Sequence, residues 1–154
     1  MICDNAIILD VEKLKMGKNC RIDSFTLINC KGGVEMDDYS CIHAGAKVVG
    51  DGGMLLGKGS VIEYNAVIVT STSKTLSHMG TMVPKEYKRI LKGKVKIGEE
   101  VFIGIGSVIM PGVKIGDRAV IGANSYISHD VPKDTIIHPK GTKNRSFTRR
   151  FRYD

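Results

Sequence analysis

The feature that most constrains this chain is a six-residue repeat of aliphatic side chains, running in blocks from Met16 to Ile127. The blocks are Met16, Ile22, Ile28; Met36, Ile42, Val48; Leu56, Ile62, Ile68; and Ile97, Ile103, Ile109, Ile115, Ile121, Ile127. A period of six matches neither the turn of a helix nor the simple alternation of a strand. The repeat therefore predicts a solenoid in which successive coils stack on one another.

A small or β-branched residue stands two positions before most of these aliphatic residues. These positions hold Cys20, Thr26, Ser40, Ala46, Ser60, Ala66, Val101, Ser107, Val113, Ala119 and Ser125. Three short strands and three tight corners take about 18 residues, so the pattern predicts a parallel β-helix of triangular section with both sets of side chains inside. The first three coils begin at Met16, Met36 and Leu56, because Gly-Gly bulges at 31–33 and 51–53 lengthen them to 20 residues.

The register breaks after Ile68 and resumes at Ile97. We expect a loop over about 70–95 that projects from the corner holding the bulges, and long excursions of this kind are often functional. Coils of 18 residues without bulges then continue to the stretch "DVPKD". The predicted organisation is a β-helix domain over 1–132 and a basic C-terminal tail over 133–154.

Composition agrees with one globular domain of 154 residues, 42% hydrophobic and 25% charged. No apolar run reaches the roughly 18 residues of a membrane span, and no basic segment precedes the first apolar one, so we expect a cytoplasmic protein. The four cysteines lack zinc-site spacing and are expected to be reduced thiols. Much of the net charge of +7 lies in the tail. We expect no nucleic-acid partner; contact with an anionic membrane surface or a phosphate-rich ligand, or simple solvation, stays open.

The stretch "VKIGEEVFIGIGSVIMPGVKIGDRAVIGANSYISHDVP" resembles the signature of the hexapeptide-repeat acyltransferase superfamily. "TMVPKEYK" and "IHAGA" are similar to the galactoside and maltose acetyltransferase branch and to sugar acetyltransferases of surface-polysaccharide biosynthesis. The resemblance implies a left-handed β-helix, acetyl transfer from acetyl-CoA, and a homotrimer. It also implies three active sites between adjacent prisms, with coenzyme A in the groove between them.

His43 stands out because the 20-residue repeat places Asp23 on the coil before it and Glu63 on the coil after it. All three follow an inward aliphatic residue, so they should face outward at one corner, at about the 4.8 Å spacing of adjacent strands. A histidine between carboxylates has its tautomer fixed and its protonated form favoured, as a general base requires. His43 is the predicted base, oriented by Asp23 or Glu63. The alternative is a charge ladder that only stabilises the stacked coils.

His78 is the competing candidate, because the catalytic histidine of galactoside acetyltransferases lies just after the strand that enters the loop. The same resemblance places His43 and Asp51 at acceptor-contacting positions, and we expect Asp23, Asp51 and Glu63 to line the acceptor site. His138 lies at the tail and has no assigned role. No histidine has the paired spacing of a metal site, so no metal is expected, and the carbonic anhydrases of this fold are disfavoured.

Corners at Gly104 and Gly122 would let a pantetheine arm approach the backbone and bond its amide groups. Further cofactor positions are implied by the resemblance: Ile105, Ala123, Ser128 and, as a neighbour of coenzyme A, His129. By charge complementarity, the phosphates would meet Lys140, Lys143 and Arg145.

These observations favour an acetyl-CoA-dependent O-acetyltransferase that acts on a sugar hydroxyl by direct transfer. One alternative is an N-acetyltransferase acting on a nucleotide-linked amino sugar, for which the same base would serve. Another is a non-catalytic β-helical trimer used as a scaffold.

Overall fold

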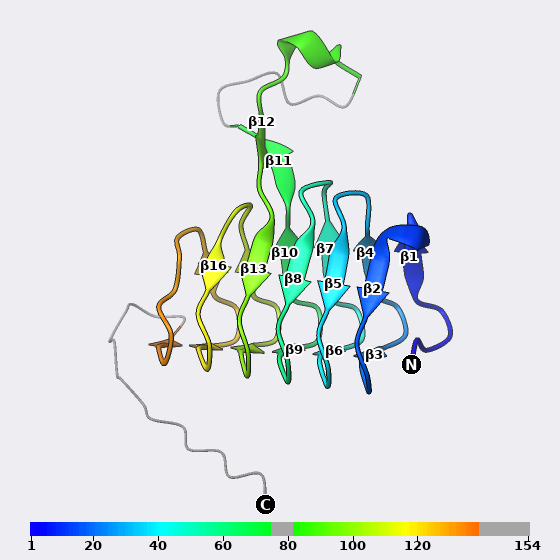
Figure 1. The fold of residues 1–154 in the computed structure, drawn as a ribbon. Coiled ribbons are helices and arrows are strands. Elements are labelled where there is room, and N and C mark those ends of the chain that lie inside the picture. Colours follow the sequence, from blue (N-terminus) through cyan, green and yellow to red (C-terminus); the bar gives the residue numbers. More distant parts are fainter. Residues whose placement is uncertain (75–81, 139–154) are drawn as a thin grey trace, which may run out of the picture.

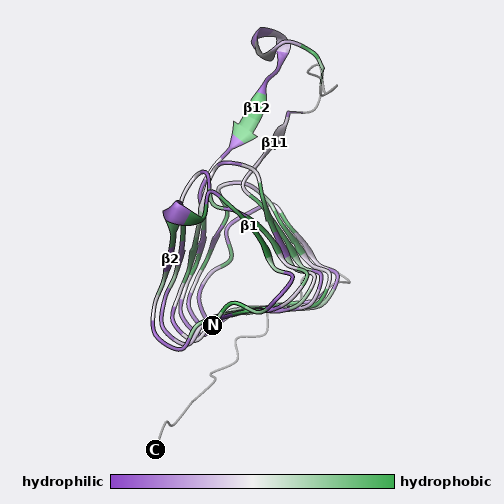
Figure 2. Cartoon of the chain, turned by 90° about the vertical axis from the view of Figure 1, so that its right-hand side faces the viewer, coloured by the Kyte–Doolittle hydropathy of each residue, from purple (hydrophilic) through white to green (hydrophobic). Residues whose placement is uncertain are grey.

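The computed structural model describes residues 1–74 and 82–138 and shows a parallel β-helix of triangular section (Figure 1, Figure 2). Sheet A consists of β3 (Arg21–Ile22), β6 (Cys41–Ile42), β9 (Val61–Ile62), β14 (Phe102–Ile103), β17 (Val120–Ile121) and β19 (Ile136–Ile137). Sheet B consists of β1 (Ile7–Leu9), β4 (Leu27–Asn29), β7 (Lys47–Val49), β10 (Val67–Val69), β15 (Val108–Ile109) and β18 (Tyr126–Ile127). Sheet C consists of β2 (Leu14–Met16), β5 (Val34–Met36), β8 (Met54–Leu56), β13 (Val95–Ile97) and β16 (Lys114–Ile115).

The pairing register confirms the predicted change of coil length. Ile28, Val48 and Ile68 pair in succession, which is a 20-residue step, whereas Ile109 pairs with Ile127, an 18-residue step. The predicted fold class, an all-β left-handed parallel β-helix with one long projecting loop, is confirmed. Of the predicted basic tail over 133–154, residues 133–138 are described and contain β19, which pairs with β17 of sheet A, whereas residues from 139 onward lie outside the described part of the chain. Among the described residues, no helix is long and apolar enough to cross a membrane.

The interior of the prism is filled as the repeat predicts. The fully buried aliphatic side chains include Ile22, Ile28, Ile42, Val48, Leu56, Ile62, Ile68, Ile103, Ile109 and Ile121. Buried hydroxyls sit beside them and donate to backbone carbonyls of the corners: Ser60 Oγ to Gly98 at 2.7 Å and Ser107 Oγ to Gly122 at 2.9 Å. Because these polar groups are satisfied, a small hydroxyl can occupy a core position without a large desolvation cost.

An arm projects from the corner where the chain passes from sheet B to sheet C (Figure 1, Figure 2). Its two sides are β11 (Ser71–Ser73) and β12 (Ile90–Lys92), which pair antiparallel, and it carries the 3₁₀ helix η2 (Lys85–Tyr87). A second 3₁₀ helix, η1 (Val11–Lys13), precedes β2 near the N-terminal end of the prism. The chain returns from the arm directly into β13, so the excursion leaves the stacking of the coils intact.

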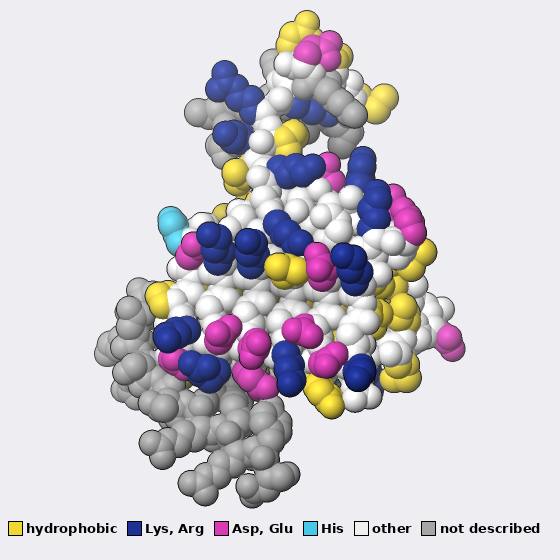
Figure 3. All heavy atoms as spheres, in the orientation of Figure 1, with side chains coloured by type: hydrophobic (Ala, Val, Ile, Leu, Met, Phe, Trp, Pro, Cys, Tyr) yellow, Lys and Arg dark blue, Asp and Glu magenta, His cyan; other side chains and the backbone are white. Residues whose placement is uncertain are grey.

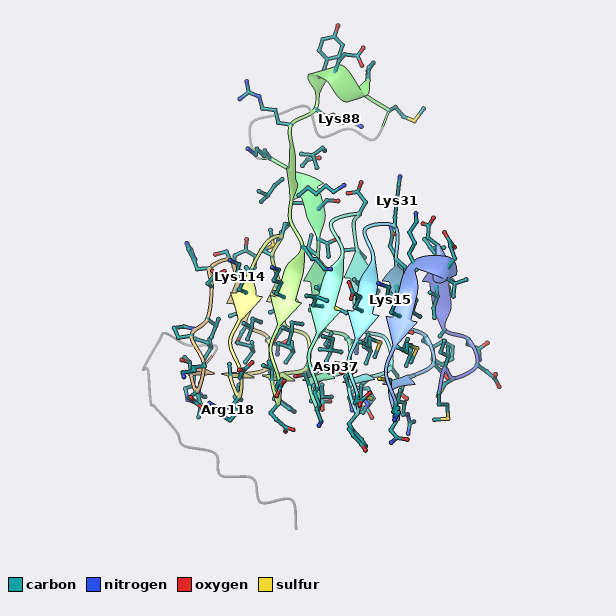
Figure 4. The ribbon with its side chains drawn as sticks, in the orientation of Figure 1. Lys15, Lys31, Asp37, Lys88, Lys114 and Arg118 are labelled. Carbon is teal, nitrogen blue, oxygen red and sulfur yellow. The ribbon has the colours of Figure 1, made fainter. Side chains whose placement is uncertain are left out.

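The three faces of the prism differ in chemistry. The outward residues of sheet C are mostly charged (Figure 3, Figure 4): Lys15, Glu35, Leu55, Lys96 and Lys114. The outward rows of sheets A and B are mostly apolar: Cys41, Val61, Phe102, Val120 and Ile136 on sheet A, and Ile7, Leu27, Val67, Val108 and Tyr126 on sheet B. Each row also holds one charged residue, Arg21 on sheet A and Lys47 on sheet B. The outer face of sheet C is therefore suited to exposure to solvent. The outer faces of sheets A and B together form an apolar wedge, which is suited to contact with protein.

Candidate functional site

His43 is placed by β6 at the corner between sheets A and B. Ile42 is fully buried and points inward, so its neighbours Cys41 and His43 both point outward on either side of it. The chain then turns through Gly45, whose φ of +73° is in the left-handed region. A Cβ at Gly45 would displace the Asn65 side chain of the next coil, so a glycine favours the close stacking of these two corners.

The strand register stacks one residue from each coil above and below His43. We call this set the corner column: Cys3, Asp23, His43, Glu63, Gly104, Gly122 and His138. The predicted alignment of Asp23, His43 and Glu63 at one corner is therefore present. Between Glu63 and His138 the column holds only Gly104 and Gly122, which leave its backbone bare there.

Asp23 is the carboxylate that orients His43. Its Oδ2 lies 2.9 Å from His43 Nδ1, whereas Glu63 Oε1 lies 3.8 Å from Nε2. An ionised carboxylate only accepts hydrogen bonds, so Nδ1–H donates a hydrogen bond to Asp23, and in the neutral imidazole Nε2 keeps its lone pair. The sequence left open whether Asp23 or Glu63 holds the ring, and the structure selects Asp23.

Asp23 is kept ionised by its surroundings although only 9% of its side chain is exposed. Burial by itself raises the pKa of this carboxyl. Hydrogen bonds from His43 and Arg21, with the charge of Arg21, outweigh that effect and hold the pKa below its usual value. Arg21 Nε donates to Oδ1, which leaves Oδ2 for the histidine. The result is a chain of contacts from Arg21 through Asp23 to His43.

Two further side chains border the imidazole. The ring of Tyr64 stacks on that of His43, with 4.9 Å between the ring centroids and 15° between the planes. Cys41 Sγ lies 3.9 Å from both ring nitrogens. Burial, followed by the charge of Asp23, raises the pKa of the Cys41 thiol to about 11, so the thiol is neutral at pH 7. Asp23, Cys41 and His43 each offer a donor atom within 4.8 Å of the others.

Sequence reasoning missed Arg21, Cys41 and Tyr64 as members of this site. Arg21 and Cys41 stand two positions before Asp23 and His43, on the outward side of the same strands, so the two-residue period of a strand was a usable signal. The stacking of Tyr64 on His43 depends on side-chain torsion angles at a corner, and the repeat says nothing about these.

Asp51 does not join this group within the chain. It lies at the corner between sheets B and C, where its carboxylate is 3.1 Å from Lys92 Nζ of β12. Hydrogen bonds from Lys92 and Ser71 lower the pKa of Asp51. His43 lies at the other edge of sheet B, so the two predicted acceptor positions are separated by the width of that sheet. His78, Lys140, Lys143 and Arg145 lie outside the described residues.

The predicted cofactor positions fall on the two corners that bound sheet B. Gly104, Ile105, Gly122 and Ala123 continue the corner of His43, where Ile105 is 50% exposed. Ser128 and His129 follow the end of β18, at the corner next to sheet C. Ser128 Oγ lies 3.0 Å from His129 Nδ1. An extended ligand could follow this face from one corner to the other.

Hollows of ≈ 440 and ≈ 410 Å³ lie elsewhere, on the outer face of sheet C. They are open and lined largely by the charged row of that sheet and its neighbouring corner. His43 instead stands on an outward corner of the prism. The side chains near His43 form an acid–base group on a convex corner. Enclosing a substrate against His43 therefore requires a second protein surface opposite this corner.

Comparison with known proteins gives concordant matches. The bacterial transferase hexapeptide family (six repeats) matches residues 94–129. A dTDP-4-amino-4,6-dideoxy-D-glucose acyltransferase of Escherichia coli is 30% identical over 88% of this chain and 72% of that relative. A galactoside O-acetyltransferase of Lactococcus lactis is 31% identical over 79% of this chain, which spans only 57% of that relative.

Among solved structures, a variant of AntD, an N-acyltransferase from Bacillus cereus, matches with a TM-score of 0.86 and 28% identity. The match covers 98% of this chain and 80% of that one, and that structure holds dTDP-4-amino-4,6-dideoxyglucose and coenzyme A. The hexapeptide repeat, the coil geometry and the likeness to these relatives agree, and this chain belongs to the hexapeptide-repeat acyltransferases, among their sugar acyltransferases.

Proposed function

We propose that this protein transfers an acyl group from an acyl-CoA, acetyl-CoA in the simplest case, to the amino group of a nucleotide-linked sugar. The observation that carries the proposal is the His43–Asp23 pair on an exposed corner, with Nε2 of the imidazole left as a base. Sequence reasoning placed a sugar hydroxyl first and an amino sugar second. The likeness to the Escherichia coli acyltransferase and to AntD supports the reverse order.

In the proposed reaction, the neutral amino group attacks the carbonyl carbon of the thioester and forms a C–N bond. His43 Nε2 takes a proton from the attacking nitrogen, and the imidazolium is stabilised by the ionised Asp23. The tetrahedral intermediate then breaks its C–S bond. Coenzyme A leaves as a thiolate and takes the proton from His43, so the imidazole returns to its starting state.

Glu63 favours an amino acceptor. Its carboxylate lies 3.8 Å from Nε2 and is 16% exposed, on the side of His43 where the base nitrogen faces. An amino group is largely positively charged in water, so a carboxylate attracts it more strongly than it attracts a neutral hydroxyl. The bound ammonium must release one proton to solvent before it can attack. Glu63 is thus proposed to bind the acceptor and to discriminate between amine and hydroxyl.

The active unit is proposed to be a homotrimer. The apolar wedge of sheets A and B ends in the corner that carries His43, and a partner prism packed on this wedge would enclose that corner. Acyl-CoA would then lie in the groove between two prisms, with its pantetheine along Gly104, Ile105, Gly122 and Ala123. Such packing would also let Asp51 of one chain face His43 of another.

O-acetylation of a sugar hydroxyl is the second candidate, supported by the likeness to the galactoside O-acetyltransferase. The base and the donor site would be the same, and only the acceptor pocket would differ. Selectivity between the two acceptors therefore decides between the candidates.

The test offers the enzyme acetyl-CoA with dTDP-4-amino-4,6-dideoxyglucose or with its 4-hydroxy counterpart as a matched acceptor. Release of free coenzyme A is followed, and the product is treated with hydroxylamine, which cleaves esters and leaves amides. We expect faster release with the amino sugar and a hydroxylamine-stable product. A labile product formed only from the hydroxy sugar would support O-transfer, and failure to bind acetyl-CoA in calorimetry would favour the scaffold.

A further inference from the structure

Three donor atoms of different chemistry meet beside the proposed base. Asp23 provides a carboxylate oxygen, Cys41 a thiol sulfur and His43 an imidazole nitrogen, all within 4.8 Å of one another. His43 Nδ1 lies 2.9 Å from Asp23 Oδ2 and 3.9 Å from Cys41 Sγ. Donors that share one tetrahedral zinc ion lie about 3 to 4 Å apart, given bond lengths of about 2.0 to 2.3 Å.

The β-helix fixes the backbone of the three donor residues before any ion arrives, and Cys41 Sγ, which is 3.9 Å from each ring nitrogen, has only to rotate toward Nδ1. Cys41 and His43 flank the buried Ile42 on β6, and Asp23 follows β3, the neighbouring strand in sheet A. Strand pairing fixes the spacing of the two coils, and Arg21 fixes Asp23 through Oδ1 while Oδ2 faces the histidine. A site assembled from rigid elements binds a metal without a large ordering cost.

We propose that Asp23, Cys41 and His43 form a binding site for a thiophilic divalent cation such as Zn²⁺, with Nδ1 as the histidine ligand. Mixed sulfur, nitrogen and oxygen donors suit Zn²⁺ and not Mg²⁺ or Ca²⁺, which prefer oxygen ligands. Three protein ligands leave a fourth position for water. His43 is 25% exposed, so an ion can reach the site from solvent.

Binding of the cation would switch off the base, a consequence that rests on the proposed function. The ion takes the place of the proton between Nδ1 and Asp23, and that proton moves to Nε2. The Cys41 thiol releases its proton to solvent, because a coordinating thiol is deprotonated. Nε2 then carries a hydrogen and cannot accept one from the acceptor. Zn²⁺ should therefore inhibit acyl transfer, and a chelator should restore it.

Arg21 limits the affinity of the site. Its guanidinium contacts Asp23, and its positive charge opposes a dication. Arg21→Gln keeps a donor for Oδ1 and removes the charge. We expect this variant to bind the cation roughly five- to tenfold more tightly than the wild type. Weaker binding would show that the positive charge is not the limiting factor and would contradict this assignment.

The direct test is titration of the reduced full-length protein with Co²⁺, whose thiolate complexes show a charge-transfer absorption band. We expect the band in the wild type and in Cys3→Ser, where the altered thiol lies 3.8 Å from Asp23 Oδ1 but outside the proposed set. Cys41→Ser should lose the band and bind Co²⁺ at least about tenfold more weakly. Cys20 and Cys30 are buried and should not contribute.

No band in the wild type, or an unchanged band in Cys41→Ser, would overturn the proposal. Loss of the band in Cys3→Ser would place the site on the other thiol and would also overturn it. The absorption needs no substrate, so its failure is separable from a failure of acyl transfer. Inhibition of Cys41→Ser by Zn²⁺ at the concentration that inhibits the wild type would likewise exclude Cys41 as a ligand.

Discussion

At the scale of single residues, His43 is held by contacts of three kinds. Asp23 accepts a hydrogen bond from Nδ1, Tyr64 stacks on the ring, and Glu63 faces Nε2. Arg21 in turn fixes Asp23. An imidazole in this setting has one tautomer and one orientation, so its basic nitrogen is presented to solvent ready for use.

Asp23→Asn tests whether this orientation matters for catalysis. An amide can rotate to donate a hydrogen bond to Nδ1, which would place the imidazole proton on Nε2 and remove the base. We expect kcat to fall roughly 10²-fold or more while KM for acyl-CoA changes little. The measurement is steady-state coenzyme A release, with circular dichroism to verify the fold. Unchanged kcat would show that Asp23 has only a structural role.

The repeat in the sequence predicted which residues of the site share a column, but not which of their side chains are in contact. The 20-residue period was enough to place Asp23, His43 and Glu63 in one column. It could not choose between the two carboxylates, because that choice depends on differences of about 1 Å in side-chain position. Asp51 matched an acceptor position by resemblance, yet within one chain it lies across sheet B. An alignment of sequences does not show whether Asp51 reaches an acceptor site within its own chain or in another copy of the chain.

At the scale of the elements, each coil combines core positions on its strands with surface positions at its corners. Ile103 of β14 is fully buried, whereas Ile105, in the turn that follows β14, is 50% exposed at the proposed cofactor groove. The repeat predicted the buried position from sequence alone. The arm was predicted as a loop projecting from the corner of the bulges, but its antiparallel pairing of β11 with β12 has no six-residue period and was not predicted.

Ile103→Ala and Ile105→Ala should therefore separate stability from binding. The first leaves a cavity in the prism and should lower the free energy of unfolding by about 2 to 5 kcal/mol. The second should leave stability nearly unchanged and raise KM for acyl-CoA by roughly three- to tenfold, since it removes apolar contact area. Chemical denaturation and initial-rate assays provide the two measurements. Equal effects of both substitutions on KM would argue against the proposed groove.

The last coil carries a pH-dependent contact. Arg118 donates from Nε to Asp134 Oδ1 at 2.6 Å and from Nη2 to Oδ2 at 2.9 Å, and these bonds lower the pKa of Asp134 from its usual 3.8. A carboxyl with a lowered pKa in the folded state stabilises the fold above pH 3.8. This contribution disappears as the pH falls below 3.8 through the folded-state pKa.

Arg118→Gln should accordingly lower Tm at pH values of about 5 to 7, and the gap from the wild type should shrink below about pH 4. Thermal melts over this range, at one ionic strength, provide the measurement. A gap of constant size down to about pH 2.5 would mean that Arg118 stabilises the coil through packing and not through Asp134.

At the scale of the whole molecule, the charge of sheet C contrasts with the apolar rows on sheets A and B. An apolar wedge left in water would be unfavourable, and the proposed trimer would bury it. The sequence predicted the trimer only through the resemblance. The outward rows of the register now give an independent physical reason for it.

Phe102→Glu and Leu55→Glu form a matched pair, because both residues point outward, from sheet A and sheet C respectively. Phe102→Glu should dissociate the proposed trimer and reduce activity at least about tenfold, since a charge would be buried at the contact. Leu55→Glu should leave both properties unchanged. Sedimentation velocity gives the assembly state. A trimer that survives Phe102→Glu would contradict the proposed packing.

The most direct test of the central claim compares kcat for transfer from acetyl-CoA in the wild type, His43→Gln, His78→Gln and His138→Gln. His138 is the matched control, because it stands on the corner column beyond Gly122. We predict that His43→Gln lowers kcat by about 10² to 10⁴, with the trimer and acetyl-CoA binding preserved, while the other two variants remain active. Full activity in His43→Gln, with loss in His78→Gln, would contradict the account and make His78 the base.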